Sequence, residues 1–411
     1  MGNARVRPSD IQIGQALKWD VCDSNGRLLL SKGHVISSDG QLDRLVRVGL
    51  YADAEALART RAEVPAEPIK PPSVTATLAV ARKKLDYLVG NVEQVIRQGV
   101  FLRGIEEITQ HIDAACSHDQ NVAMAMVLLR QEGRYATRHM INVATVVRLV
   151  ARAMKMTKDR EGSVVAAALT MNLAMADYQD ELKQQAEPLT PTQRARLDRH
   201  PLEARELLLR AGVTDPVWLT AVEQHHEHFD GSGYPGRSRC IVEAQLLCLA
   251  DVFCARIVPC AYRPAVASNV ALRGILLERG KAFDPTVAAV FIKTLGIYPP
   301  GMLVRLVSGE VGVVLQQGSN AQQPAVATFI SPQGTPTSLI LRRDTSQDAY
   351  AIAAAIDPKS FSAYINMEAI WGATAAAHGP EAHSRAKHAV RVAAALSANA
   401  AVEQGCPGLA A

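Results

Sequence analysis

HHEHFDGSGYP, residues 225–235, gathers three imidazoles and two carboxylates ahead of a turn rich in glycine and closed by proline. Imidazole and carboxylate groups are the ligands that hydrolases commonly use to hold divalent metal ions. Because glycine has no Cβ atom, the backbone of this turn can approach a phosphate group closely. The stretch therefore predicts a metal-dependent hydrolase site, provided that other parts of the chain supply the remaining ligands.

The segment ahead of this motif, DPVWLTAVEQ at 215–224, predicts a helix whose C-terminal end presents the two adjacent histidines. Successive side chains on a helix point about 100° apart. We therefore do not expect His225 and His226 to face one ion together, and the pair suits two ions or a bridging ligand. A solvated turn with incidental histidines is disfavoured, because HHE, DG and GYP occur together.

The motif resembles the signature HHExxDGxGYP of the HD-GYP family, a branch of the HD superfamily of metal-dependent phosphohydrolases. The resemblance implies a bacterial, all-helical domain that hydrolyses cyclic di-GMP with two or three iron or manganese ions. It extends to three other segments, YATRHMINVA at 135–144, PLTPTQRARLDRHPLEARELL at 188–208 and LLCLADVFCA at 246–255, so that the motif-bearing part covers residues 126–295. The metal ligands implied by this match are His139, His200, His225, His226 and Asp251.

One segment departs from the family at the histidine–aspartate (HD) pair that gives the family its name. Where the family has the form ALLHDIGKIGIPDEIL, this chain has ALTMNLAMADYQDEL at 168–182. The histidine becomes Met171, the aspartate that bridges the metals becomes Asn172, and the lysine that follows becomes Met175. A neutral amide cannot hold two cations as a carboxylate does, and a thioether is a poor ligand for hard or borderline divalent ions.

The ligands that remain limit the metal content that we expect. The ion that the HD pair binds in the family would keep only His139 and Asp251 as ligands here. His200, His225 and His226 still form a three-histidine set that can hold one ion. Without the second ion, no bridging hydroxide of the family's type forms and the attacking water is less acidic. We therefore expect no cofactor or a single divalent iron, manganese or zinc ion, and we assign no catalytic residue.

The substrate contacts implied by the resemblance are retained in part. The chain has Gly233, Tyr234 and Pro235 of the GYP loop, but the family's RPY segment, which helps to hold the nucleotide phosphates, appears as CAYR at 260–263. Arg263 is then the substrate-binding arginine, and one guanidinium group that would bind phosphate is missing. In the family the GYP loop is associated with contacts to GGDEF-domain cyclases, so its presence fits a partner-binding role.

The sequence predicts a mainly α-helical protein with a small β-rich module before the helical domain and a short β-rich segment after it. From residue 74 to about residue 295 the pattern is helical, as in the repeat of Val143, Val147, Val150 and Met154. Two apolar runs joined by SNG at 24–26 predict a hairpin, and QLDRLVRVGLY at 41–51 has helical spacing. After residue 298, β-branched runs broken by glycine and proline predict strands. The predicted boundaries are a β-rich module at 1–60, a proline-rich linker at 61–75, the helical HD-GYP-like domain at 76–297, a β-rich segment at 298–345, and an alanine-rich tail at 373–411 that forms a loose helix or is disordered.

Composition excludes several classes of protein. A formal net charge of +4 over 411 residues gives no reason to expect a nucleic acid polymer or an anionic membrane as a partner. No apolar run approaches the roughly 20 residues that a membrane span needs, and the N-terminus, MGNARVRPSD, lacks the apolar segment of a signal peptide. The seven cysteines are odd in number and form no CxxC pair, which argues against a disulfide framework. We expect a cytoplasmic protein.

Three functions remain open from the sequence. The first is a degenerate HD-GYP protein of bacterial cyclic di-GMP signalling that lacks phosphodiesterase activity and acts by binding cyclic di-GMP or a GGDEF-domain cyclase. The second is an active phosphodiesterase with an altered mononuclear site, and the third is a scaffold that binds neither nucleotide nor metal. The combined loss of a carboxylate, a histidine and a lysine favours the first. The retained GYP loop argues against the third.

Overall fold

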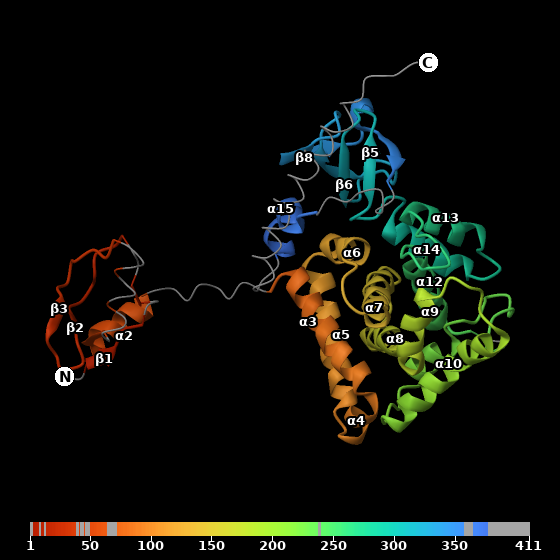
Figure 1. Ribbon diagram of the computed structural model, residues 1–411, viewed down its shortest axis with the longest axis horizontal. Helices are drawn as coiled ribbons and strands as arrows, with labels where there is room; N and C mark the ends of the chain where they lie inside the picture. The colour runs from red at the N-terminus through yellow and green to blue at the C-terminus, as the bar shows by residue number, and fades with distance from the viewer. Residues whose placement is uncertain are drawn as a thin grey trace, which may run out of the picture. The chain divides into compact units, whose positions relative to one another are not determined.

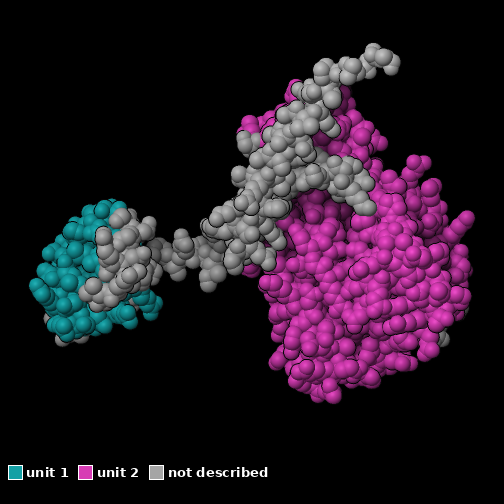
Figure 2. Space-filling model, viewed as in Figure 1, with its two compact units in different colours: residues 1–71 teal, residues 72–411 magenta. Residues whose placement is uncertain are grey.

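The structure, a computed structural model, divides into two compact units, residues 1–71 and residues 72–411 (Figure 2). It describes residues 3–376 apart from 8–9, 12–13, 38–40, 42–44, 46–49, 64–71, 237–239 and 357–364. Most of the predicted helix at 41–51, most of the predicted linker and nearly all of the alanine-rich tail lie outside the described residues. Within the described part of the chain, no helix is both long and apolar enough to cross a membrane.

The N-terminal unit contains a four-stranded antiparallel sheet and a helix. Its strands are β1 (Asn3–Arg5), β2 (Val21–Cys22), β3 (Leu28–Leu30) and β4 (Tyr51–Asp53), in the order β1-β4-β2-β3, and α2 (Ala54–Glu63) follows β4. The predicted hairpin is confirmed, since β2 pairs with β3 around the SNG turn. The carboxylate of Asp23 closes that turn by accepting from the backbone N–H groups of Asn25 and Arg27, both at 2.9 Å.

The larger unit is mainly helical from residue 74 to residue 295, as the sequence predicts. Its helices are α3 (Val74–Gly90), α4 (Val92–Arg97), α5 (Phe101–His118), α6 (Gln120–Leu129), α7 (Tyr135–Ala153), α8 (Lys158–Thr170), α9 (Ala176–Gln184), α10 (Pro191–Arg210), α11 (Pro216–Gln224), α12 (Val242–Arg256), α13 (Ser268–Leu277) and α14 (Pro285–Leu295). Several begin at side chains that cap the first backbone N–H groups, among them Thr190 of α10, which forms a full capping box, and Asp215 of α11.

Helix α7 lies in the middle of this helical body (Figure 1). Every residue from Ala136 to Ala151 is buried, so the helix contacts neighbours on all sides. Its polar side chains are therefore paired rather than hydrated. The guanidinium group of Arg148, for example, is bonded to the carboxylates of Asp113 on α5 and Glu161 on α8. This burial holds the first predicted ligand, His139, in a rigid position.

The strands predicted after residue 298 are confirmed. They are β5 (Leu303–Leu306), β6 (Val311–Gln316), β7 (Ala325–Ile330), β8 (Pro336–Asp344) and β9 (Ile352–Ala355), and they form one antiparallel sheet in the order β8-β7-β6-β5-β9. The sheet lies at the end of the helical body near α6 and α14 (Figure 1), where Gln317 donates to the carbonyl of Thr294 at 2.6 Å.

After the sheet, the chain returns to the start of the helical body. Helix α15 (Met367–Trp371) buries Met367 in the helical core, and a 3₁₀ turn at Gly372–Ala375 follows. The hydroxyl of Ser73, which also caps α3, donates to the carbonyl of Ala376 at 2.5 Å. The described part of this unit is thus closed by contacts between its two ends.

Candidate functional site

Three of the predicted ligands converge at the junction of α10 and α11. The side chains of His200, His225 and His226 offer nitrogen atoms that all lie within 4.8 Å of one another. The two adjacent histidines, which we did not expect to face one ion together, lie close enough to do so. Helix α11 ends at Gln224, so the 100° rotation per residue does not continue through His226, and the rings of His225 and His226 have centroids only 4.1 Å apart.

The hydrogen bonds of two of these rings fix where their protons lie. Nδ1 of His200 is 2.6 Å from the carbonyl oxygen of Leu197, and Nδ1 of His225 is 2.7 Å from that of Val222. A carbonyl oxygen only accepts, so each Nδ1 carries the proton and each Nε2 presents a lone pair. Second-sphere bonds of this kind orient the histidine ligands of metal sites.

The two lone pairs face each other. The Nε2 atoms of His200 and His225 lie 3.1 Å apart, which is unfavourable unless a positive charge lies between them. Two nitrogen atoms bound at about 2.05 Å to one tetrahedral ion are separated by about 3.3 Å. Burial lowers the pKa of His200 to about 3 and lowers the pKa values of His225 and His226, so the rings are neutral at pH 7, the form that binds metal. These residues fit one divalent ion.

The other two predicted ligands bind each other. Nε2 of His139 on α7 lies 2.6 Å from a carboxylate oxygen of Asp251 on α12, and the two side chains are 2 % and 13 % exposed. Burial alone would raise the pKa of Asp251, but the hydrogen bond and charge of His139 outweigh it and hold that pKa below its usual range. The pair therefore satisfies its own polar groups.

The substituted segment lies beside this pair, in the turn between α8 and α9. Met171 is fully buried among the apolar side chains of the helical core, and Met175 lines the pocket next to His139 and Asp251. Asn172 is 2 % exposed, and its side-chain oxygen has no hydrogen-bond partner within the described residues. One neutral oxygen, a pair already bonded to itself and a buried thioether do not fit a second divalent ion.

A small pocket of about 170 Å³ opens onto these groups. Besides the predicted residues His139, His226, Tyr234 and Asp251, it is lined by side chains that the sequence analysis did not select, namely Tyr135, Gln179, Lys183, Cys260 and Tyr262. A signal for part of this set was present in the sequence. Positions 175, 179 and 183 recur at a spacing of four, which places them on one face of a helix that begins at the substituted segment.

The GYP loop packs against the histidine cluster. A Cβ atom on Gly233 would overlap the backbone of His226 and His228, so this close approach requires glycine. The ring of Tyr234 stacks on that of His226, with centroids 4.7 Å apart, and the peptide bond to Pro235 is cis. Tyr234 thus faces the site, and the exposed tip of the loop is formed by Phe229 and the residues that follow it.

Arg263 has a different position from the one expected of a phosphate ligand. Its guanidinium group donates to the carbonyl oxygens of Ala255, at 2.7 Å, and Arg256, at 3.3 Å, at the C-terminal end of α12. Cations commonly satisfy the last carbonyl groups of a helix in this way. Arg263 is not among the residues that line the pocket.

Comparison with known proteins agrees with this site. Residues 119–287, which contain all five predicted metal ligands, match the family model described as HD domain. This part of the helical body is thus similar to the HD domain, as the motifs in the sequence predict. Three curated relatives, each called a cyclic di-GMP phosphodiesterase, are similar to this chain. The protein from Pseudomonas aeruginosa is 28 % identical over 229 residues, which is 55 % of this chain and 55 % of that protein. The response regulator RpfG of Xanthomonas campestris is 29 % identical over 146 residues, 34 % of this chain and 38 % of that protein.

The third relative, from Vibrio cholerae, is 37 % identical over 71 residues, 16 % of this chain and 14 % of that protein. The chain thus spans about half or less of the length of the curated relatives that it matches. Among solved structures, an HD-GYP protein from Bdellovibrio bacteriovorus has a TM-score of 0.45 and 16 % identity, over 72 % of this chain and 99 % of that one.

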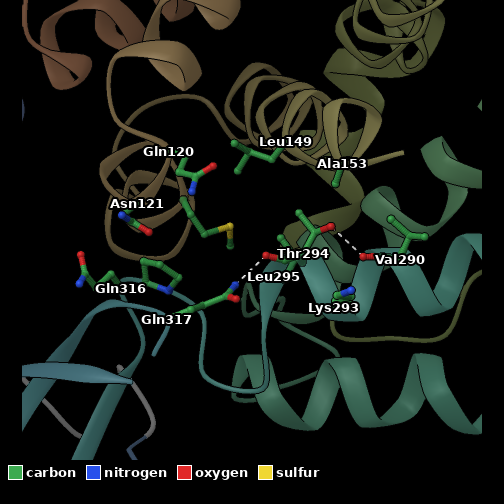
Figure 3. Close-up of a pocket in the computed structure, with 12 residues that line it drawn as sticks. Gln120, Asn121, Leu149, Ala153, Val290, Lys293, Thr294, Leu295, Gln316 and Gln317 are labelled. Carbon is green, nitrogen blue, oxygen red and sulfur yellow. Dashed lines mark hydrogen bonds between the residues drawn. The ribbon is translucent and has the colours of Figure 1, made fainter. Parts of the chain in front are cut away.

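The helical body also bounds a larger cavity of about 620 Å³ at its junction with the sheet (Figure 3). Gln120 and Asn121 of α6, Lys293 and Thr294 of α14, and Gln317 after β6 surround it in that view. The residues that line this cavity include no histidine, cysteine or carboxylate, so none can hold a metal ion or activate water. The functional site is therefore better placed at the histidine cluster, although its pocket is smaller.

Proposed function

We propose that this chain is a degenerate HD-GYP protein of cyclic di-GMP signalling that binds its nucleotide without hydrolysing it. One observation carries the proposal: where a bridging carboxylate is needed there is a neutral, buried Asn172, and the neighbouring His139 and Asp251 are bonded to each other. Hydrolysis by two metal ions needs a shared, acidified water and two cations to neutralise the phosphate. The names of the three relatives supply cyclic di-GMP as the ligand of this proposal.

The proposal includes a single divalent ion, iron, manganese or zinc, held by His200, His225 and His226. The facing Nε2 lone pairs of His200 and His225 support this assignment. When bound, such an ion supplies a Lewis acid that polarises a phosphate oxygen. The chain itself holds the rings neutral by burial and orients them through carbonyl groups, so the metal would also stabilise the junction of α10 and α11.

The test combines nucleotide titration, hydrolysis and metal analysis of the purified chain. We expect cyclic di-GMP to bind, with no release of the linear dinucleotide or of mononucleotide when Mn²⁺ or Fe²⁺ is added. Turnover on the order of 1 per second would contradict the proposal and favour the active, mononuclear phosphodiesterase. We expect about one ion per chain, lost in His200→Ala and kept in the matched variant of the exposed residue His118, His118→Ala. A chain that bound no metal ion and no nucleotide would favour the scaffold.

A protein partner, a GGDEF-domain cyclase, is a second part of the proposal. It is supported by Phe229, a large apolar side chain that is 48 % exposed at the tip of the GYP loop. We expect Phe229→Ala to weaken cyclase binding at least several-fold in a pull-down or titration. Tyr234→Ala should instead alter the nucleotide site, because that ring stacks on His226. A cyclase that binds Phe229→Ala as tightly as the native chain would remove this surface from the proposal.

A further inference from the structure

A second cavity, of about 590 Å³, adjoins the pocket of the histidine cluster. It is bounded by the start of α7, the end of α9 and the loop that follows α12. Tyr135, Lys183 and Cys260 line both spaces, so the inner pocket and this outer cavity meet at these three side chains. The backbone N–H of Ala261 donates to the carbonyl of Lys183 at 2.9 Å and ties the loop to α9.

The positive charges around the outer cavity are paired with carboxylates, with one exception. Arg134 is bonded to the carboxylates of Asp177 and Asp180, so its positive charge is already compensated and is not available to a ligand. Lys183 forms no ion pair with any residue that the structure describes, and its ammonium group lies 4.2 Å from the centre of the Tyr135 ring. Burial, followed by the nearby charge of Arg138, lowers the pKa of Lys183 below its usual value. An anion beside Lys183 would offset both the cost of burying its charge and its repulsion from Arg138.

The sizes of the two spaces limit how a nucleotide can lie. The inner pocket, of about 170 Å³, is smaller than an ordinary ligand site of roughly 300–1,000 Å³. That space accepts one phosphate group and its ester oxygens but not a dinucleotide. The outer cavity is more than three times larger and has the volume of an ordinary ligand site. A nucleotide that reaches the histidine cluster therefore has its nucleoside part in the outer cavity and a phosphate where the two spaces meet.

We propose that Lys183 is the phosphate-binding and specificity-determining residue of this chain, and that the outer cavity bounded by residues 133–135, 180–184 and 259–261 holds the nucleoside part of a phosphate ester. The inference rests on the proposed function for the identity of the nucleotide. It adds the positively charged side chain of Lys183 and the outer cavity, neither of which belongs to the histidine cluster. Lys183 comes from α9, at the same spacing of four as Met175 and Gln179, and lines the same inner pocket as Asn172, whose side-chain oxygen has no hydrogen-bond partner within the described residues.

The experiment measures the binding of cyclic di-GMP, of its linear dinucleotide and of guanosine by calorimetry. The native chain is compared with Lys183→Met, which removes the charge at similar volume, with Lys183→Arg, which keeps it, and with Lys83→Met, a matched change at an exposed position on α3. We expect Lys183→Met to weaken both dinucleotides at least tenfold and to reduce the dependence of binding on salt. Lys183→Arg should stay within about threefold of the native chain, Lys83→Met should be unchanged, and guanosine should bind weakly to all.

Three results separate the inference from the proposed function. If the native chain binds the dinucleotides and folded Lys183→Met, with unchanged circular dichroism and metal content, binds them equally well, the inference is wrong and the proposed function stands. If guanosine binds as tightly as the dinucleotides, phosphate recognition by Lys183 is also wrong. If the native chain binds neither dinucleotide, the proposed function fails and the inference fails with it.

Discussion

At the scale of the residue, the proposal of a single metal ion rests mainly on Asn172. An amide oxygen at this position is neutral, and the adjacent Met171 is buried among apolar side chains that offer no ligand. His139 and Asp251, which an ion beside Asn172 would need, are bonded to each other at 2.6 Å. The neutral amide, the buried thioether and this bonded pair all disfavour such an ion, and reverting Asn172 alone leaves the other two in place.

We predict that Asn172→Asp alone does not restore hydrolysis or a second ion. The new carboxylate still lacks a histidine beside it, and Met175 in the pocket still supplies no positive charge. The triple variant Met171→His with Asn172→Asp and Met175→Lys should raise the metal content toward two ions per chain. Elemental analysis and a hydrolysis assay check both variants. Two ions in the single variant would show that the carboxylate is sufficient.

At the scale of the element, the GYP loop depends on the absence of a side chain at one point. A Cβ atom at Gly233 overlaps backbone atoms of His226 and His228, which cannot move without displacing a histidine of the cluster. Gly162, inside α8, has no heavy atom within 4 Å of the position of its Cβ. The two glycines therefore provide a matched test of close packing against backbone flexibility.

We predict opposite effects of alanine at these positions. Gly233→Ala should destabilise the domain by about 1–3 kcal/mol through overpacking and should lower its metal content. Gly162→Ala should stabilise it by about 0.5–1 kcal/mol, because alanine is the better helix former. Denaturant unfolding of both variants provides the measurement. A Gly233→Ala variant with native stability and metal content would mean that the loop does not need its close approach to the cluster.

The C-terminal sheet contains a pH-dependent contact. Glu310, which is 6 % exposed, accepts from the guanidinium group of Arg343 at 2.8 Å and from the hydroxyl of Ser308 at 2.9 Å. Burial would raise the pKa of Glu310, but these bonds outweigh it and lower that pKa. A lowered pKa in the folded state stabilises the fold above the unfolded value of about 4.5, and this contribution is lost as the pH falls through the folded value.

We predict that Glu310→Gln destabilises the sheet by about 1–2 kcal/mol at pH 7, a modest value because Arg343 is 23 % exposed. The difference from the native chain should be constant from pH 7 down to about 4.5 and should shrink below it. Thermal unfolding of the two proteins across this range provides the measurement. A difference that stays the same at pH 3 would assign the effect to lost packing rather than to charge.

At the scale of the whole molecule, the larger unit depends on a contact between its two ends. Helix α15 buries Met367 and Ile370, and Ser73 and Thr75 at the start of α3 donate to the carbonyls of Ala376 and Ala375. The burial of each apolar side chain of this size contributes about 1.5–3 kcal/mol. This closure is part of the fold although its hydrogen bonds join residues that are 300 and 303 positions apart in the chain.

We predict that a chain ending at residue 356 is less stable than one ending at residue 376, by about 3 kcal/mol or more. Urea unfolding followed by the helical circular dichroism signal measures the difference. Met367→Ala in the full chain provides the control, since it should lose part of the same contribution without shortening the chain. Equal stability of the two truncated chains would show that α15 does not support the helical core.

The sequence alone determined the helical extent from residue 74 to residue 295, the hairpin around residues 24–26 and the strands after residue 298. These follow from local patterns of apolar residues, glycine and proline, which act over a few residues. It also contains the motifs that predict the five candidate ligands, and it shows the substitutions at positions 171, 172 and 175. Residue type limits what a group can bind wherever the fold places it.

Only the tertiary structure decided which of these groups meet. The rings of His225 and His226 lie side by side where α11 ends, and Arg263 donates to a carbonyl at the end of α12. His139 and Asp251, 112 residues apart, bind each other, and Lys183 lines the same pocket from α9. Such contacts depend on where helices end and how they pack. Those features result from interactions between distant parts of the chain, which no local pattern encodes.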